Sequence, residues 1–110
     1  MIKVIWFLKR AEGLSLSEFR QWWLGHAQDV LNSQQAHLSG YVVNIRADDD
    51  DSAPGATSDS CEWDGIAEQW FADRAAFDAA YSNPSSATRT DTLAHTSRFS
   101  RMIVDETRFR

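Results

Sequence analysis

Residues 16–31 read LSEFRQWWLGHAQDVL, and this pattern is typical of an amphipathic α-helix. Ser15 and Glu18, three residues apart, form a capping box that fixes where the helix begins. Apolar side chains recur at three- and four-residue spacing along one face, which consists of Leu16, Phe19, Trp23, His26, Ala27 and Val30. His26 is the titratable member of this face, so it is either a hydrogen-bonded core residue or a group placed for chemistry.

On the N-terminal side of this helix, residues 2–9 alternate as a β-strand does. One face carries Ile2, Val4, Trp6 and Leu8, and the other carries Ile5 and Phe7. Because both faces are apolar, we expect this strand to be covered on both sides. Residues 10–14, which include a glycine, form the turn into the helix.

On the C-terminal side, two further strands are expected at residues 40–46 and 65–71. In the first, Tyr41, Val43 and Ile45 share one face; in the second, Ala67, Gln69 and Phe71 share one face, opposite Ile66, Glu68 and Trp70. Between them, residues 48–60 read DDDDSAPGATSDS, an acidic and small-residue composition that predicts a solvated loop.

The remaining chain predicts a second helical region and a last strand. Asp73 is placed to cap a helix whose buried stripe is Phe77, Ala80 and Tyr81, and Asn83-Pro84 ends it. Residues 85–96 form a weaker, threonine-rich helical stretch, and residues 102–109 a last strand. The order β-α-β-β-α-β predicts a single α+β domain over residues 1–110, a ferredoxin-like sandwich.

This order leaves one face of the sheet without helices, because two helical layers cannot cover both sides. A large exposed apolar sheet face is rare on a monomer. We therefore expect a homodimer in which two sheets pack face to face.

Composition excludes several function classes. The net charge of −5 and the pI of about 5.0 argue against nucleic acid or an anionic membrane as a partner. Cys61 is the single cysteine, so no internal disulfide can form and a reducing, cytoplasmic location is expected. The first ten residues are too short and too charged for a signal peptide or a spanning helix.

The sequence predicts no metal site and no cofactor. The acidic run at residues 48–51 lacks the alternation, glycine and glutamate of a calcium loop. His37 and His95 have no ligands at zinc spacing, and there is no phosphate-binding loop or dinucleotide fingerprint.

Four segments, FLKRAEGLSLSEFRQWWLGHA, HLSGYVVN, WDGIAEQWF and MIVDETRF, together resemble the EthD-domain family of the dimeric α+β barrel superfamily. The resemblance spans nearly the whole chain and is most specific at the helix with Phe19, Trp23 and His26. It implies a ferredoxin-like dimer with a pocket between helices and sheet in each protomer. The superfamily includes isomerases, cyclases, dehydratases, cofactor-free oxygenases and haem enzymes.

One spacing departs from the family pattern. The helix histidine usually stands eight residues after the phenylalanine, whereas Phe19 and His26 are seven apart. The shorter spacing is similar to that of methylmuconolactone methylisomerase, a relative that uses a histidine there and a cysteine in the third strand. This chain has Gln69 at the cysteine position, so the nucleophilic thiol has no counterpart.

These observations lead to a function hypothesis. We expect His26 to move a proton next to a carbonyl of a small hydrophobic, aromatic or lactone-like compound in a degradation pathway, as a cofactor-free isomerase or lyase does. Tyr41 and Gln69 are the preferred polar partners, ahead of Asn44 and Glu68. The pocket wall is expected to consist of Phe19, Trp23 and Phe71.

Two alternatives stay open. His26 can be a core histidine without a reaction, in which case the protein is a non-catalytic binding or accessory protein in such a pathway. The resemblance to the superfamily also implies a further reading, a haem protein. Glu68 lies between apolar neighbours and is expected to form a structural ion pair with Arg46 or Arg101 rather than to act as a catalytic acid.

Overall fold

The computed structural model of this protein describes residues 1–49, 54–55, 61–82 and 86–110. The elements in these residues are β1 (Ile2–Arg10), α1 (Leu16–Gln34), β2 (Leu38–Ile45), β3 (Gly65–Phe71), α2 (Arg74–Ser82), α3 (Ser86–His95) and β4 (Thr96–Val104). This order confirms the predicted α+β class, with the second helical region divided into α2 and α3. Most of the loop expected at residues 48–60 lies outside the described residues.

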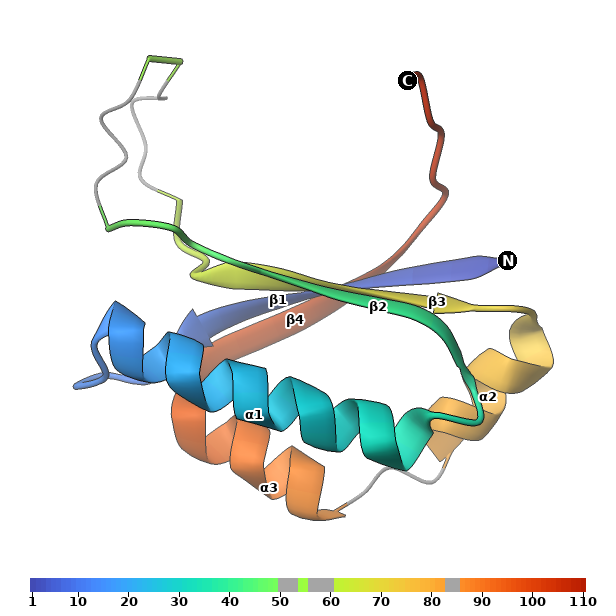
Figure 1. Ribbon diagram of the computed structural model, residues 1–110, viewed down its shortest axis with the longest axis horizontal. Helices are drawn as coiled ribbons and strands as arrows, with labels where there is room; N and C mark the ends of the chain where they lie inside the picture. Colours follow the sequence, from blue (N-terminus) through green and yellow to red (C-terminus); the bar gives the residue numbers. More distant parts are fainter. Residues whose placement is uncertain (50–53, 56–60, 83–85) are drawn as a thin grey trace.

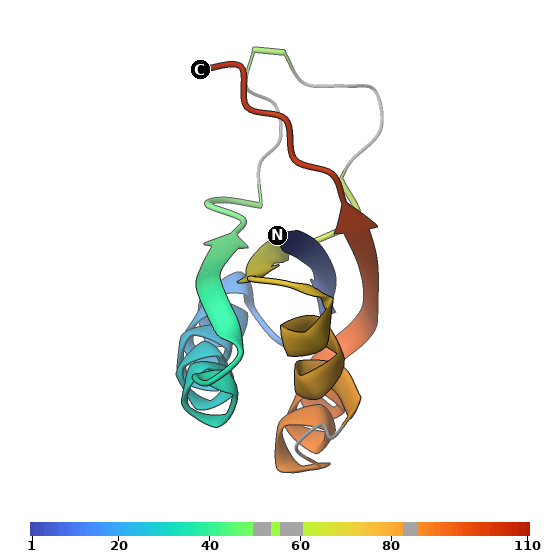
Figure 2. The same ribbon diagram turned by 90° about the vertical axis from the view of Figure 1, so that its right-hand side faces the viewer.

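The four strands form one antiparallel sheet in the order β2-β3-β1-β4. All three helices lie on the same side of this sheet, with α1 alongside α3 and α2 beyond the end of α1 (Figures 1 and 2). We call the helix-covered side the inner face and the opposite side the outer face. The C-terminal residues 105–110 project from the sheet away from the helices (Figure 1).

Helix α1 forms as the sequence predicts. Ser15 has extended backbone angles, its Oγ accepts from the backbone N of Glu18 at 3.1 Å, and the Glu18 carboxylate accepts from the backbone N of Ser15 at 3.0 Å. The predicted stripe is buried at Phe19, Trp23 and His26. The helix thus places His26 on its buried face.

The inner face holds the core as two clusters at opposite ends of the sheet. One consists of Val4, Phe71, Phe77 and Ala80, under α2. The other consists of Leu8, Phe19, Trp23 and Ala67, under α1. Trp6 packs against both clusters, and the space between them is not filled by a further cluster among the described residues. This leaves room for a pocket at the middle of the inner face.

Gly65 shows how closely α1 approaches the sheet. A Cβ atom at this position would lie 2.4 Å from the carbonyl oxygen of Asn44 and 2.5 Å from a ring carbon of Trp23. A side chain at this position would clash with both, because neither the strand backbone nor a buried ring can move that far. Gly65 therefore sets the depth at which Trp23 lies against β3.

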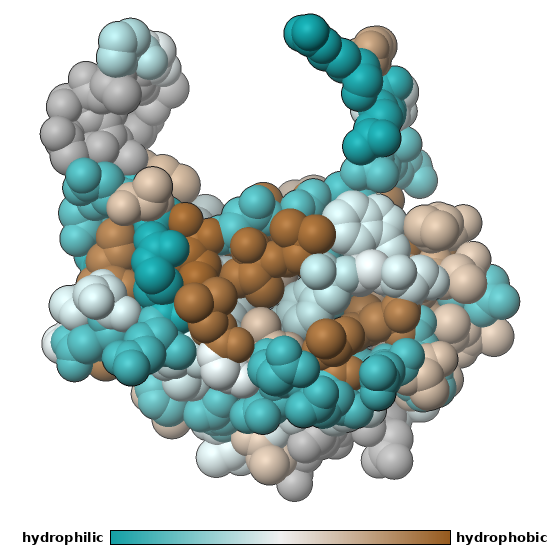
Figure 3. Space-filling view, in the orientation of Figure 1, coloured by the Kyte–Doolittle hydropathy of each residue, from teal (hydrophilic) through white to brown (hydrophobic). Residues whose placement is uncertain are grey.

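The outer face mixes apolar and charged side chains. Val42 and Met102, both on this face, are 44% and 52% exposed. Phe7 is half-buried because Trp63 packs on it, with ring centroids 5.6 Å apart. In the view of Figure 3, apolar side chains gather along the band where β2 runs above α1, and hydrophilic ones cover the lower edge.

The last strand differs from the prediction. It was expected at residues 102–109, but β4 comprises Thr96–Val104 and follows α3 directly. The register explains the difference: Arg10 pairs with Thr96 and Lys3 with Val104, so β1 ends before residues 105–109 could find a partner. The ends of β4 are therefore set by the length of β1, which cannot be inferred from the sequence of β4 itself.

Candidate functional site

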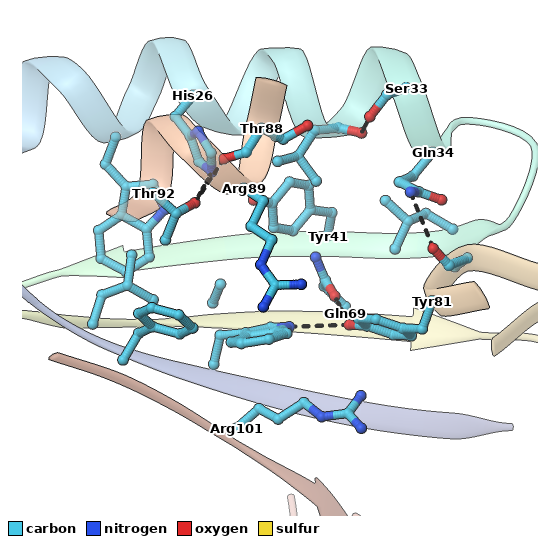
Figure 4. Close-up of a pocket in the computed structure, with 18 of the residues that line it drawn as sticks. His26, Ser33, Gln34, Tyr41, Gln69, Tyr81, Thr88, Arg89, Thr92 and Arg101 are labelled. Carbon is cyan, nitrogen blue, oxygen red and sulfur yellow. Dashed lines mark hydrogen bonds between the residues drawn. The ribbon is translucent and has the colours of Figure 1, made fainter. Parts of the chain in front are cut away.

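A pocket of about 550 Å³ lies between α1, α3 and the inner face of the sheet. Its apolar wall comes from both core clusters, including Trp23, Ala67 and Phe71. The polar side chains that line it are His26, Ser33, Gln34, Tyr41, Gln69, Tyr81, Thr88, Arg89, Thr92 and Arg101. Figure 4 shows how these side chains converge from α1 and α3 above and from the strands below.

His26 lies in the helix-side wall of this pocket and is 8% exposed. Its Nδ1 is 2.8 Å from Oδ2 of Asp91 on α3, and its ring stacks on Trp22 at 4.8 Å between centroids. Trp22 Nε1 donates to the same carboxylate oxygen at 3.0 Å. A carboxylate can only accept, so Nδ1 carries a proton and Asp91 fixes both the tautomer and the orientation of the imidazole.

The Asp91 carboxyl is held in its ionised form. Partial burial acts to raise its pKa, but hydrogen bonds from His26 and Trp22 outweigh this and hold the pKa below the usual value. His95 adds to the cluster, since its Nδ1 is 3.3 Å from the other carboxylate oxygen and its ring also stacks on Trp22 at 4.8 Å. Asp91 thus joins the two imidazoles and the indole of Trp22 in one cluster.

The other nitrogen of His26 lies within hydrogen-bond distance of the Thr92 hydroxyl, which can donate only one hydrogen bond. His26 Nε2 is 3.1 Å from Thr92 Oγ1, which is in turn 3.0 Å from the carbonyl oxygen of Thr88 (Figure 4). When His26 is neutral, the hydroxyl proton of Thr92 donates to Nε2. When His26 is protonated, Nε2 donates to Thr92, whose own proton then donates to the Thr88 carbonyl. Thr92 thus has a hydrogen bond in both protonation states.

A second polar chain crosses the floor of the pocket. Trp6 Nε1 donates to Tyr81 Oη at 3.0 Å, and Tyr81 Oη donates to Gln69 Oε1 at 2.6 Å (Figure 4). Because an indole nitrogen can only donate, the direction of the whole chain is fixed. The amide oxygen of Gln69 is therefore occupied, and its NH₂ group is left to donate into the pocket.

Tyr41 lines the pocket from β2, next to Gln69 in the sheet register. Burial, with a smaller contribution from Tyr81, raises the pKa of Tyr41 to about 12. Its hydroxyl makes no hydrogen bond within the part of the chain that the structure describes. Tyr41 is thus a neutral phenol that can donate a hydrogen bond to a bound molecule.

The structure brings together most of the residues predicted for the site. His26, Tyr41, Gln69, Trp23 and Phe71 all line the pocket. Phe19 does not line it, because its ring is fully buried against Trp23.

The predicted partner of the imidazole was wrong. Asp91 fixes the imidazole of His26, whereas Tyr41 and Gln69 make no hydrogen bond to His26. The reason is that the edge of the imidazole turns toward α3 and not toward the strands.

Sequence reasoning missed the contribution of α3. Thr88, Asp91, Thr92 and His95 follow the i, i+3, i+4, i+7 spacing of one helix face. Their polarity made the stretch resemble a weak surface helix, whereas this face turns toward α1 and supplies the partners of His26. A polar stripe at helical spacing opposite a histidine-bearing helix was the available signal.

The outer face shows a further difference. Glu68 was expected to pair with Arg46 or Arg101, but its carboxylate is 2.8 Å from Lys3 Nζ and accepts from Asn44 at 3.0 Å. Lys3 also pairs with Glu106. Arg46 instead contacts Asp64 at 3.4 Å, and Arg101 lies on the inner face. The prediction of a structural ion pair at Glu68 therefore stands with a different cation.

The described residues contain no cluster of three histidine, cysteine or acidic side chains that could hold a metal ion. Cys61 is exposed and makes no disulfide. No helix in the described parts of the chain is long and apolar enough to cross a membrane.

The chain matches the EthD domain over residues 11–100 and belongs to the EthD family. A solved EthD family protein of Bacillus halodurans has 15% identity and a TM-score of 0.70, with 97% of this chain and 99% of that chain covered. A dimeric protein of unknown function with a ferredoxin-like fold, from Bacteroides fragilis, has 12% identity and a TM-score of 0.65 over 96% and 95% of the chains.

A third similar structure is an enzyme. The hydroxynitrile lyase of Passiflora edulis has 17% identity and a TM-score of 0.64, covering 96% of this chain and 94% of the lyase. A comparison with curated protein sequences finds no match. These likenesses establish the ferredoxin-like fold.

Proposed function

We propose that this member of the EthD family is a cofactor-free enzyme that moves a proton on a small hydrophobic carbonyl compound, as an isomerase or lyase does. The observation that carries the proposal is the pair of His26 and Asp91, with Nδ1 and Oδ2 2.8 Å apart in the wall of a largely apolar pocket. The carboxylate holds a proton on Nδ1, so Nε2 is the nitrogen whose lone pair can take a proton from a substrate.

The proton would follow a defined course. The C–H bond next to the substrate carbonyl breaks, its proton goes to Nε2 of His26, and its electron pair forms an enolate. Thr92 turns its hydroxyl proton to the Thr88 carbonyl, so that Nε2 is free to take the proton and then to return it. Return of the proton from Nε2 to a different carbon gives an isomer. Alternatively, the enolate electron pair forms a C=C bond to the neighbouring carbon, and the substituent of that carbon leaves with its bonding electrons and takes the proton from Nε2.

Two donors are placed for the charge that develops on the substrate oxygen. The NH₂ group of Gln69 is aimed by the chain from Trp6 and Tyr81, and the hydroxyl of Tyr41 lies beside it in the sheet register. Donors fixed before the reaction stabilise an oxyanion without reorganisation. The apolar wall around them favours an aromatic or lactone-like body. The existence of a lyase with this fold supports the reaction class.

The test follows exchange of a carbon-bound hydrogen and needs no knowledge of the natural substrate. Small lactones and aryl ketones that raise the melting temperature are incubated in D₂O, and loss of the α-hydrogen signal is followed by proton NMR. His26→Gln is expected to slow enzymatic exchange at least about 100-fold. His37→Gln, a change at a histidine outside the pocket, is the matched control and should exchange at the parental rate. Equal rates for His26→Gln and the parent would overturn the mechanism.

A non-catalytic binding role is the second candidate. It is favoured by one observation, that Nε2 of His26 is occupied by Thr92 in the structure without ligand. In this case lactones and ketones would bind and raise the melting temperature, but no probe would exchange hydrogen in a manner that depends on His26.

The proposal includes a homodimer through the outer face. Val42 and Met102 leave this face with exposed apolar area, and its charges at Lys3 and Glu68 are already paired within the subunit. Paired charges and apolar side chains suit burial against a second sheet. The dimeric Bacteroides fragilis relative supports this assembly. Sedimentation velocity gives the mass directly.

A further inference from the structure

The charge of the pocket wall is opposite to the charge of the chain. The protein has 16 Asp and Glu residues and a net charge of −5. Among the described residues that line the pocket there is no carboxylate, whereas Arg89 and Arg101 are present. A cationic pocket in an acidic protein indicates a ligand with negative charge. The pocket wall attracts anions, whereas the rest of the protein surface repels them.

Arg101 is held in place by aromatic rings. Its guanidinium lies 4.8 Å from the ring centre of Tyr81, 5.5 Å from Phe77 and 5.9 Å from Trp6. These cation–π contacts fix the plane of the guanidinium but use none of its N–H groups on a carboxylate. Its charge acts on Tyr81, whose pKa is raised by burial and lowered in part by Trp6 and Arg101.

Arg89 reaches the same pocket from α3. Figure 4 shows its guanidinium extending down from the helix toward Gln69 and Tyr81. No carboxylate of the described residues lies within ion-pair distance of Arg89 or Arg101. By contrast, Arg10, Arg74 and Arg98 each have an acidic partner at 2.7–2.9 Å. Two guanidinium groups without a carboxylate partner among the described residues therefore line the pocket.

We propose that the pocket takes a small molecule with a carboxylate group on an aromatic or alicyclic body. The planar fork of a guanidinium matches a carboxylate with two parallel hydrogen bonds, and Arg89 and Arg101 each line the pocket. The apolar wall near Trp23 and Phe71 accommodates the uncharged body. This inference names the substrate class of the proposed function and rests on it for the reaction, but not for binding.

The test compares acids with their uncharged amides. Benzoate, phenylacetate, 3-phenylpropionate and cyclohexanecarboxylate are titrated against the full chain beside the four corresponding amides, with dissociation constants from ligand-observed NMR. At least one acid is expected to bind about tenfold or more tightly than its amide, corresponding to about 1.4 kcal/mol. The preference should weaken as salt is raised, because part of it is electrostatic.

Variants assign the preference to residues. Arg101→Gln and Arg89→Gln are each expected to remove most of the acid-over-amide preference, and Arg101→Lys to restore part of it. Arg98→Gln is the matched control: it removes the same charge from β4, but on the outer side, over Trp63. Thermal unfolding of each variant checks that it folds.

The outcomes separate this inference from the proposed function. Equal affinity of acids and amides, or an equal loss in Arg98→Gln, overturns the carboxylate proposal. An intact preference in His26→Gln, with no exchange that depends on His26 in any probe, supports the carboxylate site and removes the catalytic mechanism. Exchange that depends on His26 but is indifferent to the carboxylate supports the mechanism and removes the carboxylate site.

Discussion

The two faces of the sheet differ in whether their charged side chains form ion pairs. On the outer face, Lys3 and Glu68 are paired with each other, and Lys3 also pairs with Glu106. On the inner face, Arg89 and Arg101 line a pocket that has no carboxylate among the described residues. Both faces have large apolar side chains, so hydrophobicity alone does not distinguish them.

On the proposals above, this difference assigns the outer face to a partner subunit and the inner face to a ligand. A face whose charges are already neutralised can be buried against another protein with little desolvation cost. A face with unpaired guanidinium groups is incomplete until an anion arrives. The outer face is therefore suited to a permanent partner and the inner face to an exchangeable one.

The largest expected effect is a loss of stability when a core side chain is removed from the inner face. Trp23 is 1% exposed and belongs to the cluster that closes one end of the pocket. Trp23→Ala should lower the free energy of unfolding by about 3–5 kcal/mol, measured by urea denaturation. Leu24→Ala, on the same helix but 58% exposed, should change it by less than about 0.5 kcal/mol. Similar losses in the two variants would contradict the assignment of the core to the inner face.

The second effect concerns the outer face. Val42→Lys introduces an unpaired charge among apolar side chains that the dimer would bury. Its dissociation constant for self-association should rise at least about 100-fold, measured by sedimentation velocity. Leu93→Lys places the same charge on α3, 57% exposed, and should leave the dimer intact. If the parent protein is monomeric, the proposal of a dimer interface on the outer face is wrong.

A smaller effect is expected at the partner of the imidazole. Asp91→Asn removes the negative charge beside Nδ1 of His26 and allows the wrong tautomer, so α-hydrogen exchange should fall at least about tenfold. Nitrogen-15 NMR of the imidazole should show the change in tautomer, which a merely structural role of Asp91 would not produce. Asp29→Asn, an exposed carboxylate on α1, serves as the control. If the tautomer of His26 is unchanged in Asp91→Asn, Asp91 contributes only to packing.

The smallest effect is a pH dependence on the outer face. The hydrogen bond from Lys3, and then that from Asn44, lowers the pKa of Glu68 below its ordinary value of 4.5. A lowered folded-state pKa gives stability that is present above the ordinary value and is lost as the pH falls through the folded-state value. The melting temperature of Glu68→Gln should therefore lie below the parent at pH 7, and the gap should narrow below pH 4.5. Glu12→Gln, outside the network, should show no such gap; a constant gap for Glu68→Gln down to pH 2.5 would contradict the prediction.

The sequence predicted the features that depend on local chemistry. The capping box at Ser15, the buried stripe through Trp23 and His26, and the alternation of β3 all depend on residues close together in the chain. From these the element order and the α+β class followed, because the number of arrangements for four strands and two helical layers is small.

The predictions that were wrong concern features that depend on tertiary contacts. The ends of β4 follow from the length of β1, and the cation at Glu68 follows from the register between β1 and β3. The partner of His26 could not be found from its own helix, since Asp91 lies 65 residues away on a helix whose polar face looked solvated. Side-chain pairing across elements is set by packing, which a single sequence encodes only indirectly.

The stack of aromatic rings at Trp22 has a practical consequence. Its indole contacts His26 and His95, both at 4.8 Å between centroids, and donates to the carboxylate that lies near both imidazoles. A protonated imidazole quenches the fluorescence of an indole that it touches. The emission that disappears in Trp22→Phe is thus an optical measure of protonation at the two histidines, and it needs no added dye.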